Sequence, residues 1–171
     1  MANQLLLLIW SALFLGSRCT ADWSCEVARD WDRDDDYNSD REELMKFATA
    51  MDLPNWTDGQ KNWTDESLSI CLWQGICCNY FEGKGNRVTE IHVERNGLRG
   101  SFPPTFINMD ELLVVNVHLN NVSNFPPNVS ALRNLREAKF GRNPICGKVP
   151  EEFDLLHNLE KFNWYINCPF A

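Results

Sequence analysis

Histidine is scarce in this sequence, with only 3 among 171 residues, and the common catalytic motifs are missing. No Gly-x-Ser-x-Gly elbow, phosphate-binding loop or His-Glu-x-x-His pair occurs. These absences exclude hydrolases, kinases and zinc peptidases that depend on those motifs. We expect a protein that is not an enzyme and that uses no cofactor.

Basic residues are also few. The chain has 16 Lys and Arg against 24 Asp and Glu, a net charge of −8. Because an acidic protein is repelled by the phosphate backbone, we expect no nucleic-acid partner. The composition, 44% hydrophobic and 23% charged, is otherwise that of a folded domain.

Long hydrophobic runs are confined to the N-terminus. Leu5–Leu15 has the length of a secretory h-region and is too short to span a bilayer. Cys19-Thr20-Ala21 offers the small residues that a signal peptidase inspects, so residues 1–21 are predicted to be a signal peptide. The rest contains neither a membrane span nor the tail of a lipid-anchor signal. We expect a secreted, extracellular product, or one held at the cell surface by a partner.

The cysteines and glycosylation sequons fit that compartment. Without Cys19, six cysteines remain, which allow 15 pairings: Cys25, Cys71, Cys77, Cys78, Cys146 and Cys168. A zinc site is the alternative, but the histidines are not at ligand spacing. Four Asn-x-Ser/Thr sequons are candidate glycosylation sites: Asn55, Asn62, Asn121 and Asn128.

An internal repeat runs through the second half of the chain. Asn96, Asn120, Asn143 and Asn167 recur at intervals of 24, 23 and 24 residues, a period typical of solenoids. Apolar residues precede each Asn by eight, five and three positions: Val88, Ile91, Val93; Leu112, Val115, Val117; Leu135, Ala138, Phe140; and Leu159, Phe162, Trp164. This L-x-x-L-x-L-x-x-N template predicts a short strand with inward residues, then a structural ladder of Asn side chains.

The segments after each Asn predict the opposite, convex side. Pro103, Pro126 and Pro150 lead into Phe106, Val129 and Phe153, where we expect irregular chain or one turn of helix. The second coil is one residue short and lacks the glycine matched by Gly100 and Gly147. We therefore expect a local distortion there.

The first coil needs a cap, because a coil buries its core only against neighbours. Residues 22–86 are predicted to supply an acidic leader and this cap. Ser39 and Glu42 have capping-box spacing, and Leu44, Phe47, Ala48 and Met51 then form the apolar face of a helix that Pro54 ends. Trp56, Trp63 and Trp73 are expected to pack around the cap as core aromatics rather than to bind a ligand.

Sequence motifs in the cap and in the repeats support the same interpretation. From Arg41 to Val93 the chain reads REELMKFATAM, NW, CLWQGICC and GNRVTEIHV; LRGSFP follows at Leu98–Pro103, and ICGKVP, a looser match, at Ile145–Pro150. They resemble the cysteine cap and the L-x-G-x-I-P repeat of the plant-type extracellular leucine-rich-repeat family; kinetoplastid surface antigens carry similar elements. The resemblance implies an α/β repeat fold, a short leucine-rich-repeat solenoid of about four coils over residues 87–171, the last incomplete, with a disulfide-stapled helical N-terminal cap.

The resemblance also implies a disulfide pattern. By analogy with the family, Cys71 pairs with Cys78, and Cys77, which faces the other way along an extended segment, is then expected to pair with Cys25. Cys146 and Cys168, in adjacent coils, are expected to staple the last coil. Unlike most of the family, the chain has no separate C-terminal cysteine cap. Termination by this disulfide and an open end remain alternatives.

Residues between the inward positions are predicted to face the concave surface, where such solenoids bind partners. The expected ligand-binding residues are Glu90, His92, Glu94, Asn116, His118, Glu137, Lys139, Lys161, Asn163 and Tyr165. Val114 and Gly141 complete the columns. At any one position the alternative is a merely solvated strand residue.

Two groups of residues resemble metal sites but lack the ligands that such sites need. His92 and His118 lie near Glu90 and Glu94, but in different columns and without a third ligand. Asp30, Asp32, Asp34, Asp35 and Asp36 resemble the start of a calcium loop, but Asp35 stands at the glycine position and Arg41 at the final glutamate position. We expect no metal, and a solvated acidic leader.

The preferred function is recognition of an extracellular protein or peptide through the concave face. An inhibitor of a secreted hydrolase is one alternative, because some short members of the family inhibit cell-wall polysaccharide hydrolases. Those inhibitors have more coils and a larger concave surface than the four coils expected here, which counts against this alternative. A structural or surface-coat glycoprotein is the other. Self-association through Val114, Leu119 and Ile166 would distinguish that last case.

Overall fold

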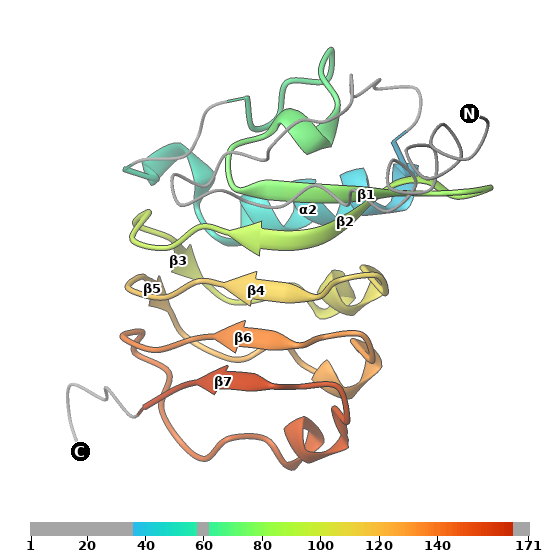
Figure 1. Cartoon of the computed structure of the whole chain (residues 1–171). Coiled ribbons are helices and arrows are strands. Elements are labelled where there is room, and N and C mark those ends of the chain that lie inside the picture. Colours follow the sequence, from blue (N-terminus) through green and yellow to red (C-terminus); the bar gives the residue numbers. More distant parts are fainter. Residues whose placement is uncertain (1–35, 58–61, 166–171) are drawn as a thin grey trace, which may run out of the picture.

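The computed structural model describes residues 36–57 and 62–165, which build a mixed sheet of five strands in the order β1-β2-β4-β6-β7 (Figure 1). Their bounds are Ile76–Phe81 (β1), Gly85–His92 (β2), Val114–Asn116 (β4), Glu137–Lys139 (β6) and Lys161–Asn163 (β7). β1 and β2 are antiparallel, and the later neighbours are parallel. This order follows the chain because each coil returns to begin the next strand beside the last, as the repeat predicts.

The inward positions of the repeat form one hydrophobic core. In the first three sets each predicted side chain is at most 2% exposed: Val88, Ile91, Val93, Leu112, Val115, Val117, Leu135, Ala138 and Phe140. Aromatic rings join successive coils, with Phe140 centred 5.8 Å from Phe102 and 5.1 Å from Phe125. The fourth set is less buried: Phe162 is 38% exposed, because no strand in the described part of the chain follows β7.

Asparagine side chains connect the coils where the strands end. Asn120 accepts hydrogen bonds from the backbone N–H groups of Asn96 and Leu98, at 2.9 and 3.0 Å, and donates to the carbonyl of Val93 at 2.8 Å. Asn143 accepts from the N–H of Val122 and donates to the carbonyl of Val117. These buried backbone groups face a turn rather than a neighbouring strand, so the amides satisfy them. Asn167 lies outside the described residues.

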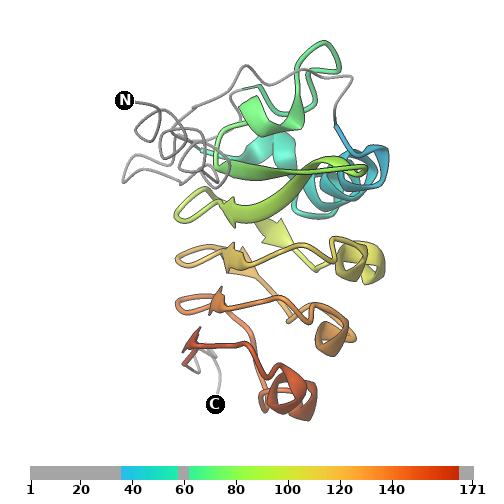
Figure 2. The same ribbon diagram turned by 45° about the vertical axis from the view of Figure 1, so that its right-hand side comes forward.

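Short 3-10 helices form the opposite side of the solenoid (Figure 2). They span Pro104–Asn108 (η5), Val129–Ala131 (η6) and Glu151–Leu155 (η7), and they bury Phe106, Val129 and Phe153. Of the two forms expected after each proline, irregular chain or a turn of helix, the structure has the helical one.

A small parallel sheet of β3 (Arg99–Gly100) and β5 (Asn121–Val122) joins the first two coils. Gly100 has φ of 138°, and a Cβ there would lie 2.0 Å from the carbonyl oxygen of Ala50 in the cap. The strand register pairs Gly100 with Val122, and the N–H of Ser123 donates to the carbonyl of Gly100. Asn124, four positions after the ladder Asn of the second coil, accepts a hydrogen bond from the N–H of Phe102. The distortion expected in this coil stays a prediction.

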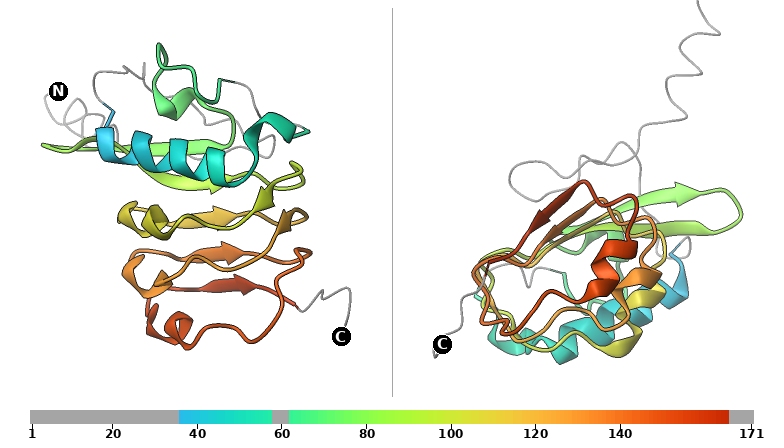
Figure 3. Two further views of the ribbon diagram at one scale, coloured as in Figure 1. Left: turned by 180° about the vertical axis from the view of Figure 1, so that it is seen from behind. Right: turned by 90° about the horizontal axis from the view of Figure 1, so that it is seen from below.

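The cap contains the helix α2 (Asn38–Ala50), which lies across the first coil (Figure 3). Leu44, Phe47 and Ala48 are buried on its inner face, as predicted. The capping-box prediction was wrong: Tyr37 is the N-cap, and no side chain caps the helix. The N–H of Tyr37 donates to the carbonyl of Asn86, which fixes the chain before Ser39 and lets the helix begin earlier. The helix ends before Pro54, followed by the 3-10 helix η3 (Leu53–Asn55).

The three cap tryptophans are core residues, at most 5% exposed. Trp63 has its ring centre 5.0 Å from that of Trp56 and 5.3 Å from that of Trp73. The indole N–H groups of Trp56 and Trp63 donate to the carbonyls of Met51 and Gln74. Burial and mutual ring contacts make all three rings structural, although the indole N–H of Trp73 is buried without a hydrogen-bond partner.

A buried ion pair joins the cap to the first coil. The guanidinium of Arg87 on β2 contacts Asp40 on α2 at 2.9 Å, and both side chains are at most 2% exposed. Arg87 also pairs with Asp110, and its guanidinium stacks on Tyr37. Desolvation opposes its charge, but the hydrogen bonds that Arg87 donates to Asp40 and Asp110 prevail and raise the pKa of Arg87.

Asp36 corrects one sequence expectation, because it is buried rather than solvated with the acidic leader. Its carboxylate accepts hydrogen bonds from the Ser69 hydroxyl at 2.6 Å and from the Ile70 N–H at 2.8 Å. Arg41 pairs with it as well. The carboxylate thus anchors the start of the 3-10 helix η4 (Ile70–Leu72). The rest of the acidic stretch lies outside the described residues.

The disulfide between Cys71 and Cys78 is present, with Cα atoms 5.5 Å apart, as the resemblance implied. It ties η4 to β1. Cys77 and Cys146 are disulfide-bonded too. Their expected partners, Cys25 and Cys168, lie outside the described residues.

Candidate binding surface

The outward side chains of the parallel strands, with the residues that follow each strand, form a continuous surface that we call the sheet face. Strand register aligns them in rows: Glu90, Val114, Glu137 and Lys161 in one, and His92, Asn116, Lys139 and Asn163 in the next. Glu94, His118, Gly141 and Tyr165 follow at the strand ends. The ten residues that the sequence singled out therefore lie in adjacent rows. Asn116 is the exception to the binding prediction, because its side chain is fully buried and cannot meet a ligand.

The cap end of the sheet face is acidic. Glu90 and His92 contact each other through Oε2 and Nε2 at 2.7 Å. Glu94 accepts a hydrogen bond from Nδ2 of Asn116 at 3.1 Å. Asn116 is fully buried and also accepts from the N–H of His118, so it links β2 to the turn after β4. These contacts hold both carboxylates in defined positions.

The centre of the sheet face lies over Gly141. A Cβ at this residue would lie 2.2 Å from Oδ1 of Asn163, and 3.0 Å from both the His118 ring and the Tyr165 ring. The three side chains therefore gather over a bare backbone, which only glycine permits. The result is a cluster of an amide, an imidazole and a phenol from the two coils on either side of Gly141.

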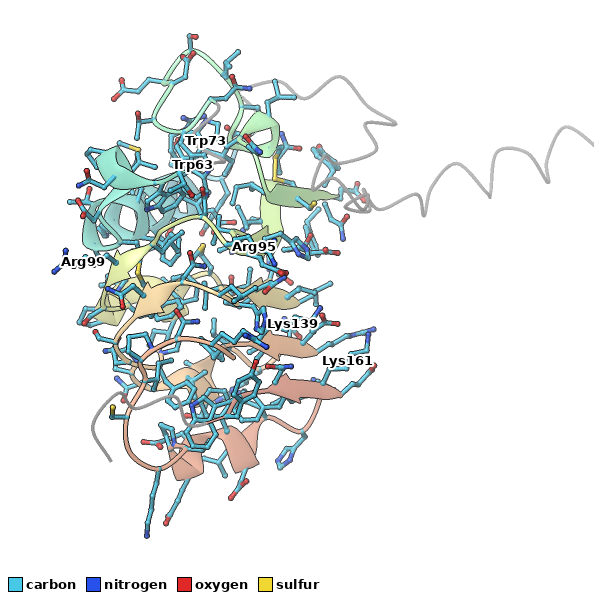
Figure 4. All side chains as sticks on the ribbon, turned by 90° about the vertical axis from the view of Figure 1, so that its left-hand side faces the viewer. Trp63, Trp73, Arg95, Arg99, Lys139 and Lys161 are labelled. Carbon is cyan, nitrogen blue, oxygen red and sulfur yellow. A yellow bond between two sulfur atoms is a disulfide. The ribbon has the colours of Figure 1, made fainter. Side chains whose placement is uncertain are left out.

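The far end of the sheet face carries two lysines around one carboxylate. Glu137 on β6 pairs with Lys139 on the same strand and with Lys161 on β7, the latter at 3.1 Å. Burial opposes the shift, but the hydrogen bonds from both lysines lower the pKa of Glu137. Figure 4 shows Lys139 and Lys161 projecting on one side of the molecule, with Arg99 of β3 on the other.

Sequence reasoning missed two exposed arginines beside β6, Arg136 and Arg142. Arg136 directly precedes the strand, and Arg142 has φ of 57° in the turn before Asn143. Arg95 and Leu119 occupy the same turn position in the two preceding coils and also have positive φ. The recurrence of this position before each ladder Asn was the signal that could have identified Arg142.

The candidate glycosylation sites lie away from the sheet-face rows. Asn55 is at the end of η3, Asn121 on β5 and Asn128 before η6, and all three are exposed. Asn62 is half-buried, and its Nδ2 donates to the carbonyl of Leu72 at 2.9 Å. Their modification remains a prediction.

Within residues 36–57 and 62–165, no group of three or more His, Cys, Asp or Glu side chains is arranged to hold a metal ion. In the same ranges no helix combines the length and apolar character needed to cross a membrane. His92 and His118 stand in different rows of the sheet face, as the sequence predicted.

Comparison with known proteins agrees with this architecture. A family model described as leucine rich repeat N-terminal domain matches residues 37–79. An inactive leucine-rich repeat receptor-like serine/threonine-protein kinase of Arabidopsis thaliana is 31% identical over 70% of this chain and 17% of its own length. Phytosulfokine receptor 1 of the same plant is 29% identical over 68% of this chain and 11% of the receptor. The chain thus spans less than a fifth of these relatives.

Solved structures show the same fold. A plant ice-binding protein matches with a TM-score of 0.64 at 22% identity, over 74% of this chain and 39% of the other. The ectodomain of the Arabidopsis receptor kinase HAESA, in complex with an IDA peptide hormone, matches with a TM-score of 0.59 at 19% identity, over 74% of this chain and 20% of the other. The matched cap and repeats place this chain in the plant-type extracellular leucine-rich-repeat family with an N-terminal cysteine cap.

Proposed function

We propose that this protein is a secreted or cell-surface module that binds an extracellular protein or peptide through its sheet face. The observation that carries the proposal is the fixed polar surface over β2, β4, β6 and β7, where the buried amide of Asn116 holds Glu94 and Lys161 holds Glu137 before a ligand arrives. A preorganised surface loses less side-chain entropy on binding. Binding without catalysis also agrees with related ectodomains, one of which is bound to a peptide hormone.

The proposed secreted module has the three segments expected from the sequence. Residues 1–21 act as a signal peptide, residues 22–86 form the leader and cap, and residues 87–171 form about four coils, the last incomplete. Disulfides Cys25–Cys77 and Cys146–Cys168 complete the staples. Glycans on Asn55, Asn121 and Asn128 would leave the sheet face open, since these residues lie on other surfaces.

The test is capture of partners from the extracellular fluid and cell surfaces of the source, with the glycosylated full-length product secreted from a host. We expect a captured protein or peptide to be lost when His92→Ala, Lys139→Ala and Tyr165→Ala are combined. A matched triple on exposed residues elsewhere, Lys148→Ala, Glu152→Ala and Leu155→Ala, should retain it. Equal capture by both triples would refute the sheet-face site.

Self-association is a second candidate, favoured by the 38% exposure of Phe162 at an inward position of the repeat. A structural or coat protein would use such a surface to pack against its own copies. Sedimentation velocity over a wide concentration range decides the question. A concentration-dependent dimer that Phe162→Ser abolishes would favour this role, and a monomer throughout would eliminate it.

A further inference from the structure

Charge is distributed unevenly along the sheet face. Glu90 lies on β2, and Glu94 and Arg95 follow in the turn after the strand. β4 and its flanks, residues 113–119, contain no Asp, Glu, Lys or Arg. Around β6, Glu137 pairs with Lys139, and Arg136 and Arg142 are exposed before and after the strand. Lys161 on β7 also pairs with Glu137, and the exposed Glu160 directly precedes that strand. The surface therefore changes from acidic through neutral to basic along the solenoid.

The side chains at both ends can meet a ligand. Glu137 is neutralised by Lys139 and Lys161, and each ammonium has three donors, so donors remain for a further acceptor. Arg142 is exposed beside them. At the acidic end Glu90 and Glu94 are half-buried, and both keep acceptor capacity beyond their contacts with His92 and Asn116.

The spacing of the two ends matches a short stretch of extended chain. Neighbouring strands are about 4.8 Å apart, so β2 and β6, with β4 between them, are separated by about 10 Å. An extended peptide rises about 3.3 Å per residue, and about three residues cover that distance. A segment of one charge sign would meet a like charge at one of the two ends.

We propose that the sheet face selects an extended peptide segment of dipolar sequence. A basic side chain of the segment lies against Glu90 and Glu94, and an acidic side chain two to four residues away lies against Lys139 and Arg142. Small or uncharged residues between them cross β4 and the cluster over Gly141. This inference rests on the proposed function and specifies the chemistry of the ligand.

The first step of the test is selection of random heptapeptides, displayed on phage, by the immobilised full-length secreted protein. We expect enriched sequences to carry Lys or Arg and Asp or Glu two to four residues apart. An unrelated acidic protein serves as the background. If no peptide is enriched over that background, this inference fails, while the proposed function is decided separately by the capture experiment with the two triple variants. Enriched peptides of one charge sign, or without charge, refute the inference alone.

The second step measures which charges face each other, using synthetic copies of one enriched peptide in double-mutant cycles. Glu90→Gln should couple to neutralisation of the basic peptide residue, and Lys139→Gln to neutralisation of the acidic one. Each coupling is expected to be about threefold in Kd, as for exposed ion pairs, and to weaken at high salt. Crossed pairs should show no coupling.

The matched controls are Glu152→Gln and Lys148→Gln, which remove the same charges at exposed positions outside the sheet face. Neither should couple to the peptide. Thermal unfolding establishes that all four variants are folded. We expect them to fold because each substitution replaces a charged group by an amide of similar size. Coupling of the controls, or crossed coupling on the sheet face, would overturn the assignment of the two ends.

Discussion

The two ends of the solenoid solve the same problem differently. At the first coil, Ile91 is fully buried because α2, β1 and the tryptophan cluster cover it, and Arg87 and Asp40 tie the cap to the coil. At the last coil, Phe162 occupies the equivalent position and is 38% exposed. The repeat template therefore specifies which side chains point inward, whereas the burial of those side chains depends on the next element in the stack.

The largest effect is expected from breaking the cap joint. Asp40→Ala should lower the free energy of unfolding by about 3–5 kcal/mol, because it removes the one fully buried carboxylate that pairs with the buried Arg87 guanidinium and leaves Asp110, Glu111 and the Tyr37 ring around it. Chemical denaturation measures the change. Glu42→Ala, exposed on the same helix, is the control and should have little effect. Equal losses in the two variants would contradict the role given to the ion pair.

The core can be compared directly at its two ends. Phe140→Ala, at 1% exposure, should cost about 3–5 kcal/mol of stability, because it leaves a cavity between coils. Phe162→Ala should cost about 1–2 kcal/mol, because part of that ring is already in water. Both are measured by urea unfolding. A similar loss at the two positions would show that something covers the last coil in solution.

The asparagine ladder gives a smaller effect. Asn143→Leu should cost about 1–3 kcal/mol, because the buried N–H of Val122 and the carbonyl of Val117 lose their partner. Asn158→Leu is the matched control, since its exposed amide makes one hydrogen bond, to the carbonyl of Arg133. Thermal or denaturant unfolding distinguishes them. A neutral result at Asn143 would argue against the ladder.

The smallest effect concerns the basic end of the sheet face. The folded-state pKa of Glu137 lies below its ordinary 4.5, so its contribution to stability is present above pH 4.5 and is lost as the pH falls through the folded pKa. At pH 7, Glu137→Gln should reduce stability by less than about 1 kcal/mol, because the partner lysines are partly solvated. The wild-type advantage should decrease as the pH falls below 4.5 and vanish below the folded-state pKa. An advantage that persists in acid would mean that the ion cluster does not stabilise the fold.

Much of the fold could be predicted because the repeat is local and periodic. The inward sets, the ladder positions, the 3-10 turns after the prolines and the helix around Phe47 all follow from spacing in the sequence. The capping box failed because a backbone hydrogen bond from Tyr37 to Asn86, 49 residues away, sets the start of the helix. The solvated acidic leader failed at Asp36 for the same reason, since its partners Ser69 and Ile70 are distant in sequence.

The candidate site divides in the same way. The spacing of the repeat predicts that Glu90, Glu137 and Lys161 share one row, and the strand register confirms it. It could not show that Glu137 is held by two lysines, or that Asn163, His118 and Tyr165 meet over Gly141. Those contacts depend on side-chain conformations between coils.

Residue spacing in the sequence predicted the solenoid, its period and the residues of the sheet face, because apolar residues that recur at a fixed period are buried when the coils stack. The tertiary structure alone decided how the cap is joined to the first coil, how far the last coil is covered and which sheet-face groups are paired. Those features depend on buried charges and on close approaches between residues more than twenty positions apart, which no local pattern records.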